Sequence, residues 1–186
     1  MAITIHSTSG AANANSYLSL NDAQAVIDGL IEDDDVVAWG SSTTDQKNRA
    51  LYTAAQRIDR ERFLGSRTTD TQAMQWPRTG VRRPDTHIST YSIGFIYRNS
   101  EDFFAETEVP IQIKNAQAVL AVYLNNNKDG LGLSGLEDYK NIEVGTIKAE
   151  PNFSGSVGFN RVPPLFERYL TGIRISSPGN ISVKRS

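Results

Sequence analysis

Apolar residues recur at helical spacing along three stretches of the chain, and these stretches define the expected fold. The first, 20–30, places its apolar residues on one face of a helix and follows Ser19, a residue type favoured at the N-cap. The acidic run 32–35 comes next and is expected to be a loop that ends near Trp39.

The second stretch predicts the clearest helix. Thr43 and Gln46 have the spacing of a capping box, and apolar residues repeat at helical intervals over 50–58. Arginines occupy much of the other face, so we expect an amphipathic helix that ends near 63–65. The third helix should begin at Pro110, and its apolar residues cover so much of its girth that it should be the most buried.

The C-terminal part has a different pattern. Residues 140–150 alternate between apolar and polar and predict a strand that Pro151 ends. From residue 152 the chain is rich in Gly, Ser and Pro, with one short helical turn expected at 163–170. Ordering a chain costs about 1 to 2 kcal/mol per residue, more than these few apolar side chains can offset. This arm is therefore expected to need a neighbouring molecule.

Together these patterns predict a mainly α protein. It should be a small helical bundle with a short β element and an extended C-terminal arm. We expect a body over 1–151 that includes a long loop at 84–108, and a docking arm over 152–186.

Composition narrows the function classes. The 186 residues include no cysteine, which excludes disulfides, thiolate metal sites and a cysteine nucleophile. The net charge of −2 conceals blocks of opposite sign: residues 1–44 hold six acidic and no basic residues, whereas 45–83 hold nine basic and four acidic. Such alternation suits copies of a subunit that dock on one another. Without a membrane-length apolar stretch or a secretory signal, we expect a cytoplasmic product with no membrane partner.

Groups for catalysis are sparse. His6 and His87 have no companion at metal-ligand spacing, and the acidic residues of 101–108 follow no EF-hand pattern. Gly130–Gly135 matches the letters of GxGxxG, but a helix precedes it and a strand follows, the reverse of a dinucleotide site. We therefore expect no enzyme activity, no catalytic residues, no cofactor and no metal.

The stretch AMQWPRTGV, residues 73–81, has two interpretations. In the first, Trp76, Pro77 and Arg78 form a buried structural plug, with Trp76 wedged between the second and third helices. In the alternative, an exposed Trp76 stacks on single-stranded DNA while arginines contact phosphates. Those arginines would be Arg57, Arg60, Arg62, Arg67, Arg82 and Arg83. The plug is preferred because one aromatic residue makes a poor track for a strand of bases.

Several motifs, in order, carry a family resemblance. They are NSYLSL (15–20), RIDRERFLGSR (57–67), QAMQWPRTGV (72–81) and a Pro-led, alanine-rich helix. This series resembles the head-to-tail adaptor (connector) proteins of tailed bacteriophages, a family also described as DnaT-like single-stranded DNA-binding proteins. The resemblance covers about residues 13–125 and, weakly, 140–150.

The resemblance implies a structural protein of the virion that is assembled in the host bacterial cytoplasm. Such subunits form a homo-oligomeric ring, commonly twelvefold, between the portal protein of the DNA-filled head and a tail, tail-terminator or nozzle protein. Duplex DNA would pass through the lumen without specific binding. The C-terminal arm would contact the portal through Phe159, Arg161, Val162, Pro163, Leu165, Phe166, Tyr169, Leu170, Ile173 and Arg174. Single-stranded DNA binding through the Arg57–Arg83 region stays as the alternative function.

Overall fold

The computed structural model describes residues 3–84, 102–127, 139–143, 148–151 and 162–175. Its helices are α1 (Leu20–Ile27), α2 (Asp34–Ser41), α3 (Thr44–Ile58), α4 (Ile111–Asn126) and α5 (Pro164–Leu170). Two antiparallel pairs of strands accompany them: β1 (Ser66–Arg67) with β2 (Arg78–Thr79), and β3 (Tyr139–Glu143) with β4 (Lys148–Pro151). The predicted mainly α class is confirmed.

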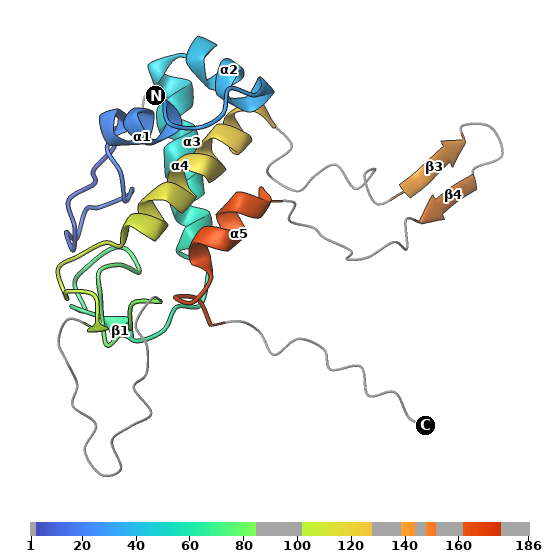
Figure 1. Ribbon diagram of the computed structural model, residues 1–186. Helices are drawn as coiled ribbons and strands as arrows, with labels where there is room; N and C mark the ends of the chain where they lie inside the picture. The colour runs from blue at the N-terminus through green and yellow to red at the C-terminus, as the bar shows by residue number, and fades with distance from the viewer. Residues whose placement is uncertain (1–2, 85–101, 128–138, 144–147, 152–161, 176–186) are drawn as a thin grey trace, which may run out of the picture.

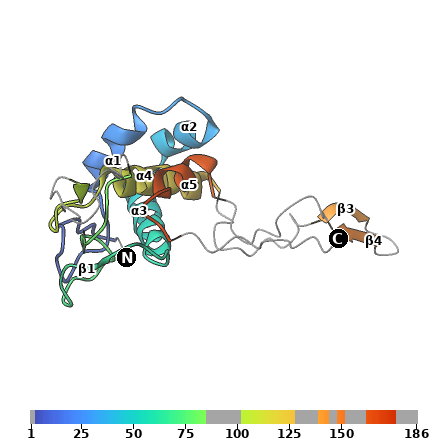
Figure 2. The same ribbon diagram turned by 60° about the horizontal axis from the view of Figure 1, so that its bottom comes forward.

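Helix α4 is the centre of the bundle. It packs against α1, α2, α3 and α5, which surround it in Figures 1 and 2. Eight of its residues are buried, as its apolar girth predicts: Ile113, Ala116, Gln117, Ala118, Val119, Leu120, Ala121 and Val122. Pro110, the predicted first residue of the helix, is instead its N-cap, so the helix begins one residue later than predicted.

A buried glutamine joins α4 to its neighbours. Gln117 donates to the carbonyl oxygen of Leu51 (2.9 Å) and to Ser16 Oγ (2.7 Å), and its Oε1 accepts from the backbone N–H of Tyr17 (2.9 Å). An unpaired buried amide would cost free energy, so this full set of bonds fixes how α3 and the segment before α1 approach α4.

The predicted helix starts are confirmed more closely than the ends. Ser19 caps α1, and Thr43 with Gln46 forms the capping box of α3. Helix α1 ends at Ile27 rather than 30, and α3 ends at Ile58 rather than near 63–65. Caps act through local hydrogen bonds, whereas these ends depend on contacts with distant segments.

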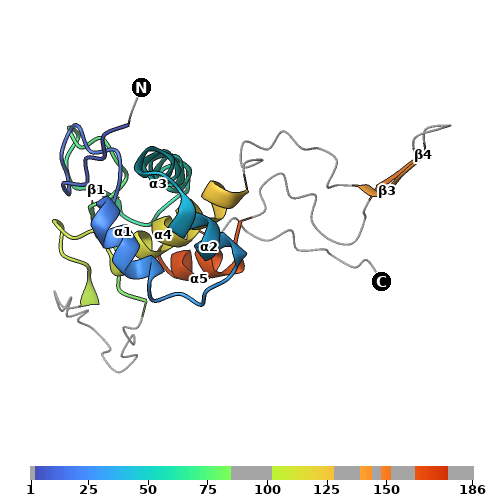
Figure 3. The same ribbon diagram turned by 90° about the horizontal axis from the view of Figure 1, so that it is seen from above.

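Two elements differ from their predictions. The acidic run 32–35 is not a loop throughout, because Asp33 caps α2 and two acids occupy its first turn, where the helix dipole favours them. The predicted strand 140–150 is a hairpin, with Pro151 as the last residue of β4 paired with Tyr139. This hairpin stands apart from the helices in all three views (Figures 1, 2 and 3).

The C-terminal arm requires a correction. Residues 162–175 do not need another molecule in order to fold. Helix α5 packs on α4, and Phe166, Leu170 and Ile173 are buried. Backbone bonds from Leu64 to Ile173 (3.1 Å) and from Ile175 to Arg62 (2.7 Å) tie the segment to the chain after α3. The entropy argument failed because it counted only the arm's own apolar residues and not the surface of α4. The remainder of the predicted arm and most of the loop 84–108 lie outside the described residues.

Candidate functional site

Trp76 and Pro77 are buried in the core of the protein. Trp76 is 1% exposed, and its ring meets Phe63 (5.6 Å between centroids, 69°) and Phe104 (6.1 Å, 89°) edge to face. Edge-to-face packing is a preferred arrangement of aromatic pairs. With both faces of the indole enclosed, no surface is left on which a base could stack.

Arg78 lies beside it and is also buried. Its guanidinium donates to the carbonyl oxygens of Leu64 (2.8 Å) and Gly65 (2.6 Å) and to Gln75 Oε1 (2.8 Å). Burial lowers the pKa of this guanidinium. Arg78 therefore ties the chain after α3 to the Trp-Pro segment. A side chain at Gly65, where φ is +67°, would collide with the backbone of Thr79.

Asp59, which the sequence analysis did not single out, joins three segments. Its carboxylate at the C-cap of α3 accepts the hydroxyl of Tyr17 and the backbone N–H of Gln75 (3.3 Å). Burial raises the pKa of Asp59, against the lowering effect of the bond from Tyr17. Burial and the charge of Asp59 likewise raise the pKa of Tyr17 well above its usual value. Only the fold brings these three positions together.

Two of the arginines predicted to contact DNA are engaged in the protein. Arg82 Nη2 lies 3.4 Å from Asp102 Oδ2, and Arg83 Nη2 lies 3.1 Å from Glu108 Oε2. Each guanidinium also lies over the ring of a phenylalanine. These contacts hold the segment after β2 against 102–108, and a phosphate would have to compete with them.

The other four arginines follow one another along the chain from the end of α3. Arg57 is half-buried, and burial is the main cause that lowers its pKa. Arg67 is exposed and donates to the carbonyl oxygen of Gln72 (3.3 Å). Arg60 and Arg62 are exposed and form no ion pair with any residue that the structure describes. Unlike Arg67, Arg82 and Arg83, these two exposed side chains have no hydrogen bond or ion pair with the described residues.

The predicted portal-contact residues likewise divide into residues engaged within the protein and residues that are exposed. Phe166, Leu170 and Ile173 are core residues, so they are not available as anchors for another protein. Arg174 pairs with Glu167 and with Glu61 (3.3 Å) inside the chain. Burial lowers the pKa of Arg174, but its hydrogen bonds to Glu167 and Glu61 and their negative charges together outweigh this effect, so the pKa is raised overall. Val162, Pro163 and Tyr169 are half-buried and Leu165 is exposed, whereas Phe159 and Arg161 lie outside the described residues.

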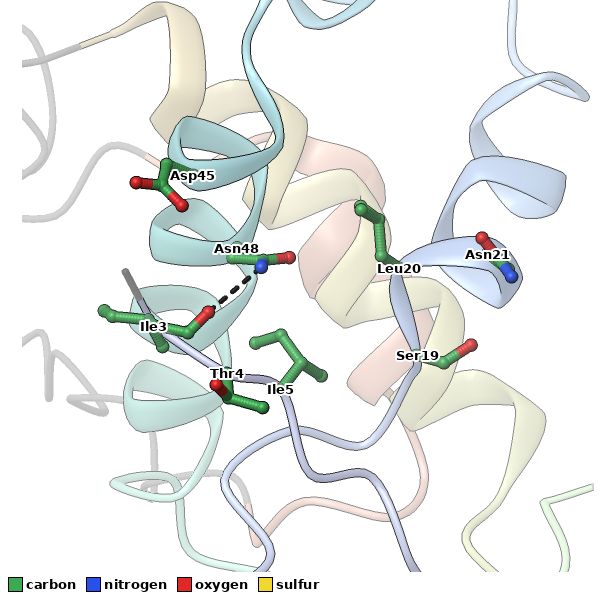
Figure 4. A pocket seen from close by; sticks show the side chains of 8 residues that line it. All are labelled: Ile3, Thr4, Ile5, Ser19, Leu20, Asn21, Asp45 and Asn48. Carbon is green, nitrogen blue, oxygen red and sulfur yellow. Dashed lines mark hydrogen bonds between the residues drawn. The ribbon is translucent and has the colours of Figure 1, made fainter. Parts of the chain in front are cut away.

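A shallow pocket of about 390 Å³ lies between the N-terminal segment, the start of α1 and the start of α3 (Figure 4). Asn48 donates to the carbonyl oxygen of Ile3 (3.0 Å) at its edge. The Oδ1 of Asn48 is buried and has no partner in the described part of the chain. The lining residues are Ile3, Thr4, Ile5, Ser19, Leu20, Asn21, Asp45 and Asn48.

Within the described ranges, His, Asp and Glu side chains form no group of three or more that could hold a metal ion. His87 and the Gly130–Gly135 motif lie outside those ranges. None of the described helices has the length and apolar character needed to cross a membrane.

The described residues thus define a small helical-bundle protein in which Trp76 and Arg78 are buried and Arg82 and Arg83 are held by ion pairs. A comparison with known protein families identifies the family of this helical-bundle protein. Residues 1–185 match the family model described as "Putative DnaT-like ssDNA binding protein", and the chain belongs to that family. Comparisons with curated proteins and with solved structures found no match.

Proposed function

We propose that the chain is a head-to-tail adaptor subunit of a tailed bacteriophage, which forms a ring beneath the portal and links the filled head to the tail. The observation that carries this proposal is the β3–β4 hairpin, which stands apart from the helical bundle (Figure 3). A lone two-stranded hairpin is marginally stable in water. Contact with another subunit or with a partner protein would stabilise it.

The packing of α5 changes which residues could contact the portal. Phe166, Leu170 and Ile173 are part of the core. The contact with the portal would therefore involve the exposed Leu165 and the chain on either side of residues 162–175. The helical bundle then acts as a rigid base from which the hairpin reaches a partner.

The test is to mix the protein with portal rings and to image the mixture by electron microscopy. Wild-type protein should decorate the rings. A variant in which a Gly-Ser linker replaces 139–151 should keep its helical circular dichroism and lose decoration. Equal decoration by this variant would contradict the role of the hairpin, and no decoration by the wild type would contradict the adaptor function.

Single-stranded DNA binding is the second candidate, and the family match favours it more directly than it favours the adaptor. Arg60, Arg62 and Arg67 would contact phosphates, since Arg82 and Arg83 are held by ion pairs and Trp76 is enclosed. Three phosphate contacts predict a slope of log K against log salt of about −2. Fluorescence anisotropy with an oligonucleotide should then show binding that R60E/R62E abolishes, whereas no binding at about 50 mM salt would exclude this function.

A further inference from the structure

Two surfaces at opposite ends of α3 carry opposite charge together with exposed apolar side chains. The first, termed the acidic corner, comprises Ile31, Glu32, Asp34 and Val37, at and before the start of α2. Ile31 is 88% exposed and Val37 is 55% exposed. Glu32 and Asp34 are exposed and form no ion pair within the described ranges, and residues 1–44 supply no lysine or arginine.

The second surface, termed the basic end, comprises Arg60, Arg62, Leu64 and Ile175. The backbone bond from Ile175 to Arg62 (2.7 Å) brings the C-terminal segment beside the chain that follows α3. Leu64 is 39% exposed and Ile175 is 48% exposed. Each surface therefore joins two apolar side chains to two charges that lack a partner in the described part of the chain.

One copy of the chain cannot bring these surfaces together. The 15 residues of α3 separate them by about 22 Å at 1.5 Å per residue. Helix α2 lies at one end of α3, and β1 lies near the other (Figure 1). Single exposed apolar residues are common, but here each pair adjoins charges that the opposite surface complements.

We infer that the acidic corner of one copy docks on the basic end of a second copy. Glu32 and Asp34 pair with Arg60 and Arg62, while Ile31 and Val37 cover Leu64 and Ile175. Because the two surfaces differ, the contact is heterologous, and its repetition gives a closed ring or an open filament. This inference rests on the proposed assembly role and names the surfaces that would build it.

Sedimentation equilibrium of the full chain tests the inference. Wild-type protein should self-associate, and added salt should weaken the association because it screens the charge pairs. The corner variant E32K/D34K and the end variant R60E/R62E should each associate at least about tenfold more weakly. A variant with all four reversals should recover association. Single reversals at the exposed Asp70 and Arg168 show whether a charge reversal elsewhere on the surface also weakens association.

A mixture gives a sharper outcome. Each variant alone places like charges against one another, whereas in the mixture the intact corner meets the intact end and the reversed corner meets the reversed end. The mixture should therefore recover association that neither variant shows alone. A monomeric wild type, or reversed variants that associate as the wild type does, would overturn the inference. Portal decoration by the same samples separates the two proposals: decoration that survives both reversals contradicts only these surfaces, whereas a self-associating wild type that ignores portal rings contradicts only the adaptor function.

Discussion

Tyr17 donates its hydroxyl to the carboxylate of Asp59, and this bond joins the segment before α1 to the end of α3. The carboxylate is half-buried, so the stability of its charge depends on the few donors that the fold supplies. The hydrogen bond therefore stabilises the junction of the two segments, although partial burial of the ionised Asp59 carboxylate costs free energy.

Removing the donor should expose that cost. Tyr17→Phe leaves Asp59 with only the backbone N–H of Gln75 and should lower the free energy of unfolding by about 1 to 3 kcal/mol. Asp59→Asn keeps an acceptor oxygen without the buried charge and should change stability little. Urea unfolding at pH 7 measures both, and a larger loss in Asp59→Asn than in Tyr17→Phe would contradict this account.

The same carboxylate predicts a pH dependence. Burial raises the pKa of Asp59 in the folded protein, so between the unfolded and folded pKa values the folded state holds a proton that the unfolded state has released. The contribution of Asp59 to stability is thus full below the unfolded pKa and is lost as pH rises through the folded pKa. Unfolding measured across this range should show the fall in wild type and not in Asp59→Asn.

Arg78 should tolerate no other cation. Lysine cannot reproduce the fork that reaches Leu64, Gly65 and Gln75, so Arg78→Lys should lower the free energy of unfolding by about 2 to 3 kcal/mol. The exposed Arg60 provides the matched control, and Arg60→Lys should stay within about 0.5 kcal/mol of wild type. Chemical denaturation compares them; equal effects would show that Arg78 is not a structural tie.

The buried ring of Trp76 should stabilise the fold because it fills space in the core. Trp76→Ala opens a cavity between Phe63 and Phe104 and should cost about 3 to 5 kcal/mol. Thermal unfolding followed by circular dichroism would measure this loss. A change below about 1 kcal/mol would mean that the ring does not support the bundle.

Truncations should distinguish the packed part of the C-terminal region from the residues that follow it. A chain that ends at Ile175 keeps α5 and should unfold as the full chain does. A chain that ends at Pro151 loses Phe166, Leu170 and Ile173 from the core and should be severely destabilised. Circular dichroism melting compares the two, and a stable fold in the shorter chain would restore the hypothesis of an independent arm.

The sequence supported the helical class because helix signals are local. Ser19, Thr43 and Gln46 act within one turn of the helices that they begin, and their hydrogen bonds depend little on the rest of the chain. Helix α2 was missed because its signal, an Asp33 cap followed by acids, resembles an acidic loop when the helix is only eight residues long.

The candidate surfaces were harder to foresee. Sequence placed six arginines in one region, but it could not show that Asp102 and Glu108 neutralise two of them. Nor could spacing reveal the junction of Tyr17, Asp59 and Gln75, whose members are far apart in the chain.

By itself, the sequence determined where α1 and α3 begin, which face of each is apolar, and that α4 is the most buried, because these properties follow from hydrogen bonds and periodicity within a few residues. Only the tertiary structure decided that α5 belongs to the core and that Arg60 and Arg62 stay exposed. The physical reason is that burial and charge pairing depend on surfaces contributed by distant segments. A short apolar helix such as α5 becomes stable only when α4 supplies the area on which it packs.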